Sequence, residues 1–494
     1  MGFYRPCALL AVGAVRAVLI FTAAGASAAP RAGGVKPFLD DTAELTNVLD
    51  AFDDDDPFDF HISAAYAARF KSAKIRRESS LSQAGLTQGG FTAINENIAN
   101  YQQVTHSLNI TAEAGLWHDL GLRIKLPVVL SDSRTLSSLD GSSANPQRYA
   151  QGDGAALFSL PFTSPTRSGL DWLGLEVAWG ITNQRRTPGL PSWLGSIEVR
   201  LPIGDPLHAC NANASPQCPN IFADTTPDGR FTNGASSRSA GLNRGMTTVI
   251  ARSAVSRRYG DVEPYGQFSI LADFPGTGSD FSTQNTQRGI ILDRPPVIGT
   301  VISGVEITAN EERENGRRLV FDVQARGSYI SPGRDYSELF DALGSSRASS
   351  LATPSPAAYT DNGAGGSMPS TSAGKVYFTG ITDIAPHIAL GSRVAVRWQV
   401  NPLVLFTLGV GFEWVQGHAI TGGDECNTGV KAGSLGEAAN CKSVSARNPQ
   451  GEASYKSTGI PNPNYRPSID SAGRRFRADD TLITDVWANL SLLF

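Results

Sequence analysis

The last stretch of the chain, LITDVWANLSLLF from Leu482 to Phe494, decides its fold. Apolar and polar side chains alternate along it, as in a strand with one apolar and one polar side. The apolar face carries Val486, Ala488, Leu490, Leu492 and Phe494. The other face carries Asp485, Trp487, Asn489 and Ser491. Such a strand suits a sheet that closes on itself within a bilayer, because closure leaves no edge with unpaired backbone groups.

The end of this strand also resembles a known signal. A carboxy-terminal Phe that closes an alternating strand is similar to the terminal signal of Gram-negative outer-membrane β-barrel proteins. The resemblance implies that Leu490, Leu492 and Phe494 form an assembly signal. It also implies two partners, which are the barrel assembly machinery and the lipid of the outer membrane.

Residues 1–28 are typical of a secretory signal peptide. Arg5 gives a charged start, an apolar stretch runs from Ala8 to Ala24, and Ala26-Ser27-Ala28 is a cleavage site of the A-x-A type. A membrane anchor is the alternative, but Arg16 interrupts the apolar stretch and makes it a poor permanent span. We therefore predict an exported protein.

Composition limits the remaining possibilities. After the signal, no apolar run is long enough for a membrane-spanning helix. Any membrane-spanning structure must then be built from alternating strands. The formal net charge of -4 gives no basic surface for nucleic acid, so we expect no nucleic-acid partner.

Alternation recurs along the chain at regular intervals. The expected strands cover residues 60–71, 103–117, 120–130, 171–183, 193–203, 246–259, 262–272, 297–309, 318–330, 385–398, 403–417 and 482–494. Short and long connections follow one another in strict order, as in outer-membrane barrels. The sequence therefore predicts an all-β fold over residues 59–494. It is a transmembrane antiparallel up-and-down β-barrel of about 12 strands, with short periplasmic turns and long extracellular loops.

Two segments of the expected long loops have some regular character of their own. Residues 152–162 have some strand character, but a spanning strand there would move every later connection to the opposite side of the membrane. We therefore expect a loop. In the loop after residue 330, Tyr336, Leu339, Phe340 and Leu343 recur at helical spacing, which predicts a short amphipathic helix.

Residues 29–58 are predicted to form a periplasmic N-terminal segment. It ends in an acidic run, Asp53 to Asp56. Carboxylates are suitable calcium ligands. The run lacks spaced ligand positions and a glycine turn, so a solvated charge run is the favoured interpretation.

The cysteines outside the signal fit an oxidising compartment. They are Cys210, Cys218, Cys426 and Cys441. Four cysteines allow three connectivities, and the short spacing favours local disulfides between Cys210 and Cys218 and between Cys426 and Cys441. Without CxxC spacing or nearby His pairs, we do not predict a zinc site.

If the apolar faces meet lipid, the polar faces line the lumen. Basic and acidic residues there are nearly equal in number. This balance fits either a weakly selective pore or a lumen closed by paired charges. The candidate lumen-lining residues are Arg123, Lys125, Arg393, Arg397, Glu113, Glu176, Glu306 and Asp322.

A membrane-embedded hydrolase is a less favoured alternative. His106 falls on an apolar strand face beside Ser107, but adjacent residues of a strand face opposite sides. The chain has no GxSxG sequence at a strand-to-helix turn and no HExxH sequence. We predict neither enzymatic activity nor a cofactor.

Two short motifs resemble a protein family. Leu201-Pro202-Ile203-Gly204-Asp205 ends one strand, and GDVEPYG over residues 260–266 forms a turn and begins another. Both resemble pieces of the outer-membrane transporter-like family linked to phenol-degradation pathways. The resemblance implies a channel for small-molecule solutes with passive or weakly selective passage. A structural or adhesive barrel that acts through its extracellular loops is the alternative, and the oligomeric state stays open.

Overall fold

The structure is a computed structural model. It describes residues 43–49, 59–82, 91–139, 157–184, 186–213, 217–219, 238–276, 279–281, 294–312, 315–346, 348–351, 353–354, 375–376, 378–423, 442–447, 453–457, 465–470 and 473–494. The predicted signal peptide, the acidic run at residues 53–56, Cys426 and Cys441 lie outside these residues.

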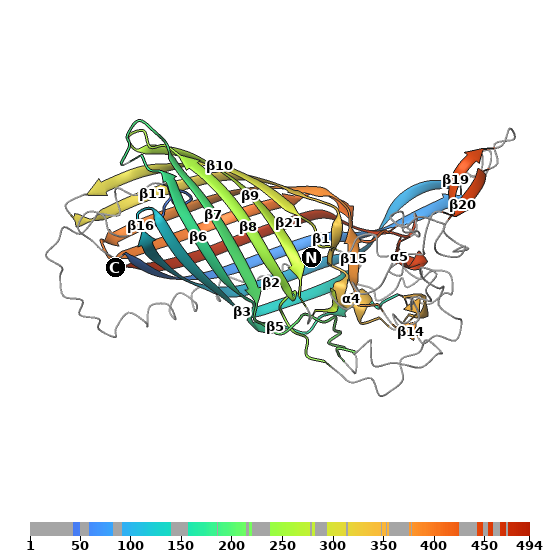
Figure 1. The fold of residues 1–494 in the computed structure, drawn as a ribbon. Helices are drawn as coiled ribbons and strands as arrows, with labels where there is room; N and C mark the ends of the chain where they lie inside the picture. Colours follow the sequence, from blue (N-terminus) through green and yellow to red (C-terminus); the bar gives the residue numbers. More distant parts are fainter. Residues whose placement is uncertain are drawn as a thin grey trace, which may run out of the picture. The chain divides into compact units, whose positions relative to one another are not determined.

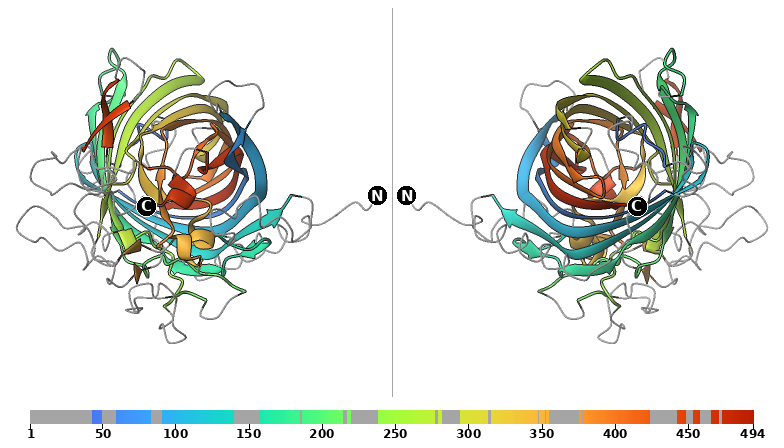
Figure 2. Two further views of the ribbon diagram at one scale, coloured as in Figure 1. Left: turned by 90° about the vertical axis from the view of Figure 1, so that its right-hand side faces the viewer. Right: turned by 90° about the vertical axis from the view of Figure 1, so that its left-hand side faces the viewer.

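Twelve antiparallel strands form a closed barrel (Figures 1 and 2). They are β1 (Phe60–Ser82), β2 (Phe91–Trp117), β3 (Leu120–Ser138), β6 (Trp172–Thr182), β7 (Ser192–Pro202), β8 (Met246–Ser256), β9 (Val262–Pro275), β10 (Ile298–Glu312), β11 (Arg317–Ile330), β16 (His387–Asn401), β17 (Val404–Val415) and β21 (Phe476–Leu493). Each pairs with its neighbour in the chain, and β21 pairs with β1 to close the ring. The predicted fold class and strand number are confirmed.

The two faces of the wall follow the alternation of the sequence. Large apolar side chains point outward, and Ile197 and Leu408 leave 60% and 62% of their surface uncovered by protein. The terminal strand behaves in the same way: Val486 and Leu492 are exposed on the outside, while Asn489 and Ser491 line the interior. An uncovered apolar face of this extent suits contact with lipid.

Short turns gather at one end of the barrel. Asp119 turns β2 into β3 with a φ of 44°, a left-handed conformation that Asp tolerates. Gly260, with a φ of 62°, turns β8 into β9. The first and last strands meet at the same end, where Phe60 and Phe494 exchange backbone hydrogen bonds of 3.1 and 2.9 Å.

The described parts of the long connections lie at the opposite end, on the right in Figure 1. Their small elements are β4 (Phe162–Thr163), β5 (Arg167–Leu170), β12 (Gly333–Tyr336), α4 (Phe340–Gly344), η4 (Ser349–Leu351), β13 (Thr353–Pro354), β14 (Lys375–Val376), β15 (Ile381–Ile384), β18 (His418–Ala419), β19 (Lys442–Arg447), β20 (Ala453–Ser457) and α5 (Pro467–Asp470). Among the described residues, no helix is long and apolar enough to cross a membrane.

Apolar packing within the chain is concentrated at this far end. Interior residues of β1 and β21, such as Ile75 and Phe476, pack in one cluster with Leu339 and Leu343 beside and within α4. These four side chains are fully buried. A short helix is therefore present over Phe340–Gly344, and Leu343 helps to fill the end of the barrel. Tyr336 belongs to β12, and all five helix residues are buried, so the predicted amphipathic character is wrong.

Four strands extend beyond their expected limits at the far end: β1, β2, β3, which ends at Ser138, and β21, which begins at Phe476. β1 continues to Ser82 and β2 begins at Phe91, well beyond the expected limits of 71 and 103. Among the described side chains of these extensions, the exposed positions are polar, as at Ser72, Lys74 and Asn97, so the alternation that marks a lipid-facing strand is lost. In the 152–162 region, residues 157–161 form no strand, and β4 pairs with β3 without crossing the barrel.

Candidate functional site

Charged side chains near the short-turn end form a closely paired group on one side of the lumen. We call Lys125, Glu176, Glu198, Arg200 and Arg252 the inner charge cluster. Lys125 Nζ lies 2.6 Å from Glu176 Oε2 and 3.0 Å from Glu198 Oε2. Arg200 Nε donates to Glu198 Oε1 at 2.6 Å, and Arg252 pairs with both carboxylates. Both carboxylates are buried and each contacts at least two of the cations, so their negative charges are paired within the cluster.

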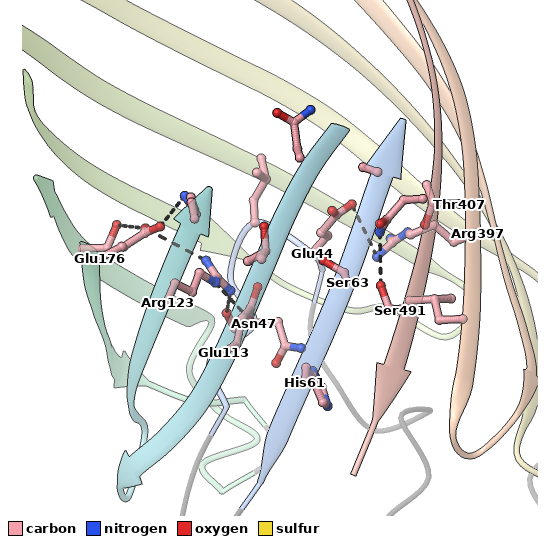
Figure 3. Close-up of a pocket in the computed structure, with 18 of the residues that line it drawn as sticks. Glu44, Asn47, His61, Ser63, Glu113, Arg123, Glu176, Arg397, Thr407 and Ser491 are labelled. Atoms are coloured by element: carbon pink, nitrogen blue, oxygen red, sulfur yellow. Dashed lines mark hydrogen bonds and ion pairs between the residues drawn. The ribbon is translucent and has the colours of Figure 1, made fainter. Parts of the chain in front are cut away.

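A second group lies across the lumen. Arg397 on β16 pairs with Glu306 on β10, and its Nη1 atom is 3.9 Å from Glu44 Oε2. Figure 3 shows Arg397 directed toward Glu44 on one side of the site and Arg123 beside Glu113 on the other. Arg123 Nε is 2.9 Å from Glu113 Oε2. The lumen therefore has two charged walls, each with its own pairing.

Residues 43–49 lie between these walls. Glu263 Oε1 accepts the backbone N–H of Ala43 at 2.8 Å, and Glu306 Oε1 accepts that of Glu44 at 2.9 Å. Arg123 Nη2 donates to the carbonyl oxygen of Asn47 at 3.2 Å. Residues 43–49 belong to no sheet, so their backbone groups need other hydrogen-bond partners. The wall supplies them, because carboxylates are strong acceptors for backbone N–H groups. The predicted periplasmic segment 29–58 thus places residues 43–49 inside the barrel.

A polar cavity of about 410 Å³ adjoins this segment. Glu44, Leu45 and Asn47 border it, together with charged residues of both walls. Its neutral polar lining comes from Ser63, Asn109, Thr111, Ser196, Gln267, Thr407, Asn489 and Ser491. Hydroxyl and amide groups of this kind both donate and accept hydrogen bonds, so the cavity suits water and small hydrophilic solutes.

The structure places the eight candidate lumen residues in three locations. Arg123, Lys125, Glu113 and Glu176 lie together on the wall of the inner charge cluster. Arg397 and Glu306 pair on the opposite wall. Asp322 lies beside Glu306, its register partner across β10 and β11, and accepts a 2.5 Å hydrogen bond from Tyr265. Arg393 lies apart from both groups, 3.7 Å from Asp485.

Sequence reasoning missed the contribution of residues 43–49 and of Glu263. Alternation placed Glu263 and Glu306 on the inner face of their strands. It carried no signal that their carboxylates accept hydrogen bonds from a distant segment.

A buried ion pair organises the opposite end of the barrel. Arg167 on β5 contacts Asp341 of α4 through two hydrogen bonds, of 3.0 and 2.6 Å. Asp341 Oδ1 also accepts the backbone N–H of Cys210 at 3.0 Å, and Cys210 forms a disulfide with Cys218 as predicted. Asp341 therefore joins α4, β5 and the disulfide loop.

A second contact links this end to the lumen wall. Lys71 Nζ on β1 lies 2.7 Å from Glu338 Oε1, just before α4. Burial disfavours the charged form of Glu338, but the Lys71 ammonium and the His418 ring lower its pKa to about 2. The paired carboxylate therefore helps to hold the α4 region against β1.

The residues considered for hydrolysis are separated by the wall. His106 faces outward and bonds through Nδ1 to the Tyr66 hydroxyl at 2.7 Å. Ser107, its neighbour in the strand, points to the other face. Within the described ranges, no group of three or more His, Cys, Asp or Glu residues is arranged to hold a metal ion.

A closed antiparallel barrel with an apolar exterior and a polar interior defines the chain as an outer-membrane-type β-barrel. The chain matches no family model and no curated protein. Solved structures of this architecture are similar to it. An outer membrane channel from Pseudomonas putida F1 is 7% identical, with a TM-score of 0.36, and the match covers 89% of this chain and 96% of that one.

Two further solved structures show the same general likeness. The toluene transporter TodX of Pseudomonas putida is 8% identical, with a TM-score of 0.30 and 92% of each chain covered. The outer membrane protease OmpT from Escherichia coli is 9% identical, with a TM-score of 0.23, and the match covers 88% of this chain and 97% of that one. At these identities the likeness concerns the fold alone.

Proposed function

We propose that this chain is a non-enzymatic outer-membrane channel for passive or weakly selective passage of small hydrophilic solutes. It would be exported with a cleaved signal peptide and inserted by the barrel assembly machinery, with Leu490, Leu492 and Phe494 as the assembly signal. The single observation that carries the proposal is the polar cavity of about 410 Å³ inside a closed barrel with an apolar exterior.

The arrangement of the lumen supports a controlled pathway. Residues 43–49 border the cavity at the short-turn end, and the α4 region fills the opposite end with apolar side chains. Passage then requires that both segments move. Residues 43–49 are held mainly through hydrogen bonds to side chains, without strand pairing, so their displacement leaves the barrel wall intact.

Conductance in planar bilayers tests this function. We expect the refolded full chain to conduct, and we expect a variant without residues 43–49 to show a larger single-channel conductance. A matched control is Arg317→Ala, because this exposed side chain lies at a turn, away from the cavity. Folding of each variant is checked by its heat-sensitive electrophoretic mobility. A folded barrel that stays silent with and without residues 43–49 contradicts the proposal.

A further inference from the structure

We infer that the middle of the lumen holds a binding site for a small aromatic carboxylate. The inference deepens the proposed channel function and rests on it, because the site lies on the path that a solute would take. The site consists of a tryptophan platform, Trp487, and two guanidinium groups, Arg69 and Arg393, on adjoining strands of one wall.

The platform depends on a glycine. Trp487 on β21 pairs in register with Gly409 on β17, and an added Cβ at Gly409 would lie only 2.1 Å from the indole ring. The ring therefore rests against the backbone of β17, where only glycine leaves room. Its other register neighbour is Ala67, and Gly409 in turn pairs with Ala395. Small residues on both sides leave the wall recessed around a large, half-buried aromatic ring.

The charged groups form the next row of the same wall. Register pairing runs from Arg69 on β1 to Asp485 on β21, then to Gly411 on β17 and Arg393 on β16. The Arg393 guanidinium carbon lies 5.4 Å from the centre of the Trp487 ring. An anion held by these arginines would thus place an attached ring beside the tryptophan.

These arginines differ from those of the inner charge cluster in how they are paired. Arg69 Nε is 3.6 Å and Arg393 Nη2 is 3.7 Å from the oxygens of Asp485, beyond hydrogen-bond distance. The two side chains are 53% and 41% exposed. Neither donates a hydrogen bond to any residue that the structure describes. The row therefore carries two positive charges against one negative charge, with free donors directed at the lumen.

The chemistry of the row selects the ligand class. A guanidinium binds a carboxylate through two parallel hydrogen bonds, and a second carboxylate would balance the charge of the row. A flat ring gains further contact by stacking on the indole face. A neutral ring would lack the ionic contacts, and an anion without a ring would lack the stacking. The row below, with Ala65, Asn489 and Thr407, lines the polar cavity, so the site adjoins it directly.

Binding is measured on the refolded full chain by fluorine NMR, with 4-fluorobenzoate as the probe. We expect saturable line broadening, and we expect Arg393→Gln and Arg69→Gln each to weaken the affinity about tenfold or more. Trp487→Leu should reduce the affinity for 4-fluorobenzoate to that for fluoroacetate. Arg317→Gln is the matched control for the loss of a guanidinium and should bind like wild type.

The outcomes separate this site from the channel function. Conductance without saturable 4-fluorobenzoate binding overturns the site and leaves the channel. Binding in a barrel that does not conduct supports the site and contradicts the channel function. Affinity that is unchanged in both arginine variants and in Trp487→Leu also overturns the site, provided that each variant keeps the heat-sensitive mobility of the folded barrel.

Discussion

Individual residues in this protein have roles set by how fully they are paired. Glu198 is fully buried and contacts three cations of the inner charge cluster, so its charge is satisfied within the wall. Arg393 lies in the same lumen but is 41% exposed and 3.7 Å from its nearest carboxylate. The first arrangement favours a stable wall, and the second leaves hydrogen-bonding capacity for a ligand.

The buried pair at the far end gives a prediction at the residue scale. Asp341→Ala leaves the Arg167 guanidinium buried without its carboxylate. We expect the free energy of opening of the α4 region to fall by about 3–5 kcal/mol. Hydrogen exchange of the amides of residues 340–344 measures this change. Arg317→Ala, which removes an exposed pair with Glu312, should change it by less than about 1 kcal/mol. Unchanged exchange in Asp341→Ala would contradict the assigned role.

At the scale of the element, each strand of the barrel is a boundary between lipid and lumen. β17 shows this with Leu408 facing outward and Thr407 lining the cavity. The strand is stable only while its outward side chains remain apolar, because the lipid core cannot solvate a charge.

Substitutions at two depths test this view of β17. Leu408→Arg should destabilise the folded barrel by about 2–4 kcal/mol in bilayer unfolding titrations. Leu403→Arg, in the adjoining turn at the barrel end, should cost about 0–1 kcal/mol, because the side chain reaches the interface. Equal costs at the two positions would show that the depth assigned to β17 is wrong.

At the scale of the whole molecule, contacts between distant parts of the chain close the two ends of the barrel. Lys71 on β1 and Glu338 in the connection between β11 and β16 meet at the far end. Their ion pair holds the α4 region against the wall. The stability of the closed end therefore depends on pH.

The pKa of Glu338 determines the sign of this dependence. Its pKa is lowered from 4.5 to about 2 in the folded chain. The ionised group therefore stabilises the closed end above pH 4.5, and this contribution is lost as pH falls from 4.5 to about 2. The loss is on the order of 3 kcal/mol. Glu338→Gln should lack this part of the pH profile of hydrogen exchange in α4. The difference from wild type gives the contribution of Glu338 separately from those of His387 and His418. Identical profiles would contradict the prediction.

The barrel, its strand number and the inward or outward direction of most side chains follow from the amino-acid sequence alone. Alternation is a local property that can be read from the residues of a single strand. A shift of the strand register by one residue would turn every polar side chain of that strand toward lipid. The direction of Arg393, Glu306 and Asp322 follows from this rule alone. Lipid imposes this alternation only on the residues that contact it. The extensions of β1 and β2 were therefore not predictable from alternation.

The contacts of the inward side chains, in contrast, become visible only in the folded barrel. Glu263 accepts a hydrogen bond from Ala43, which is 220 positions away in the chain, and Glu306 accepts one from Glu44 across 262 positions. The packing of Trp487 against Gly409 likewise requires that β21 and β17 lie side by side. No local pattern records such contacts, because they arise only when the closed wall brings distant residues to the same height in the lumen.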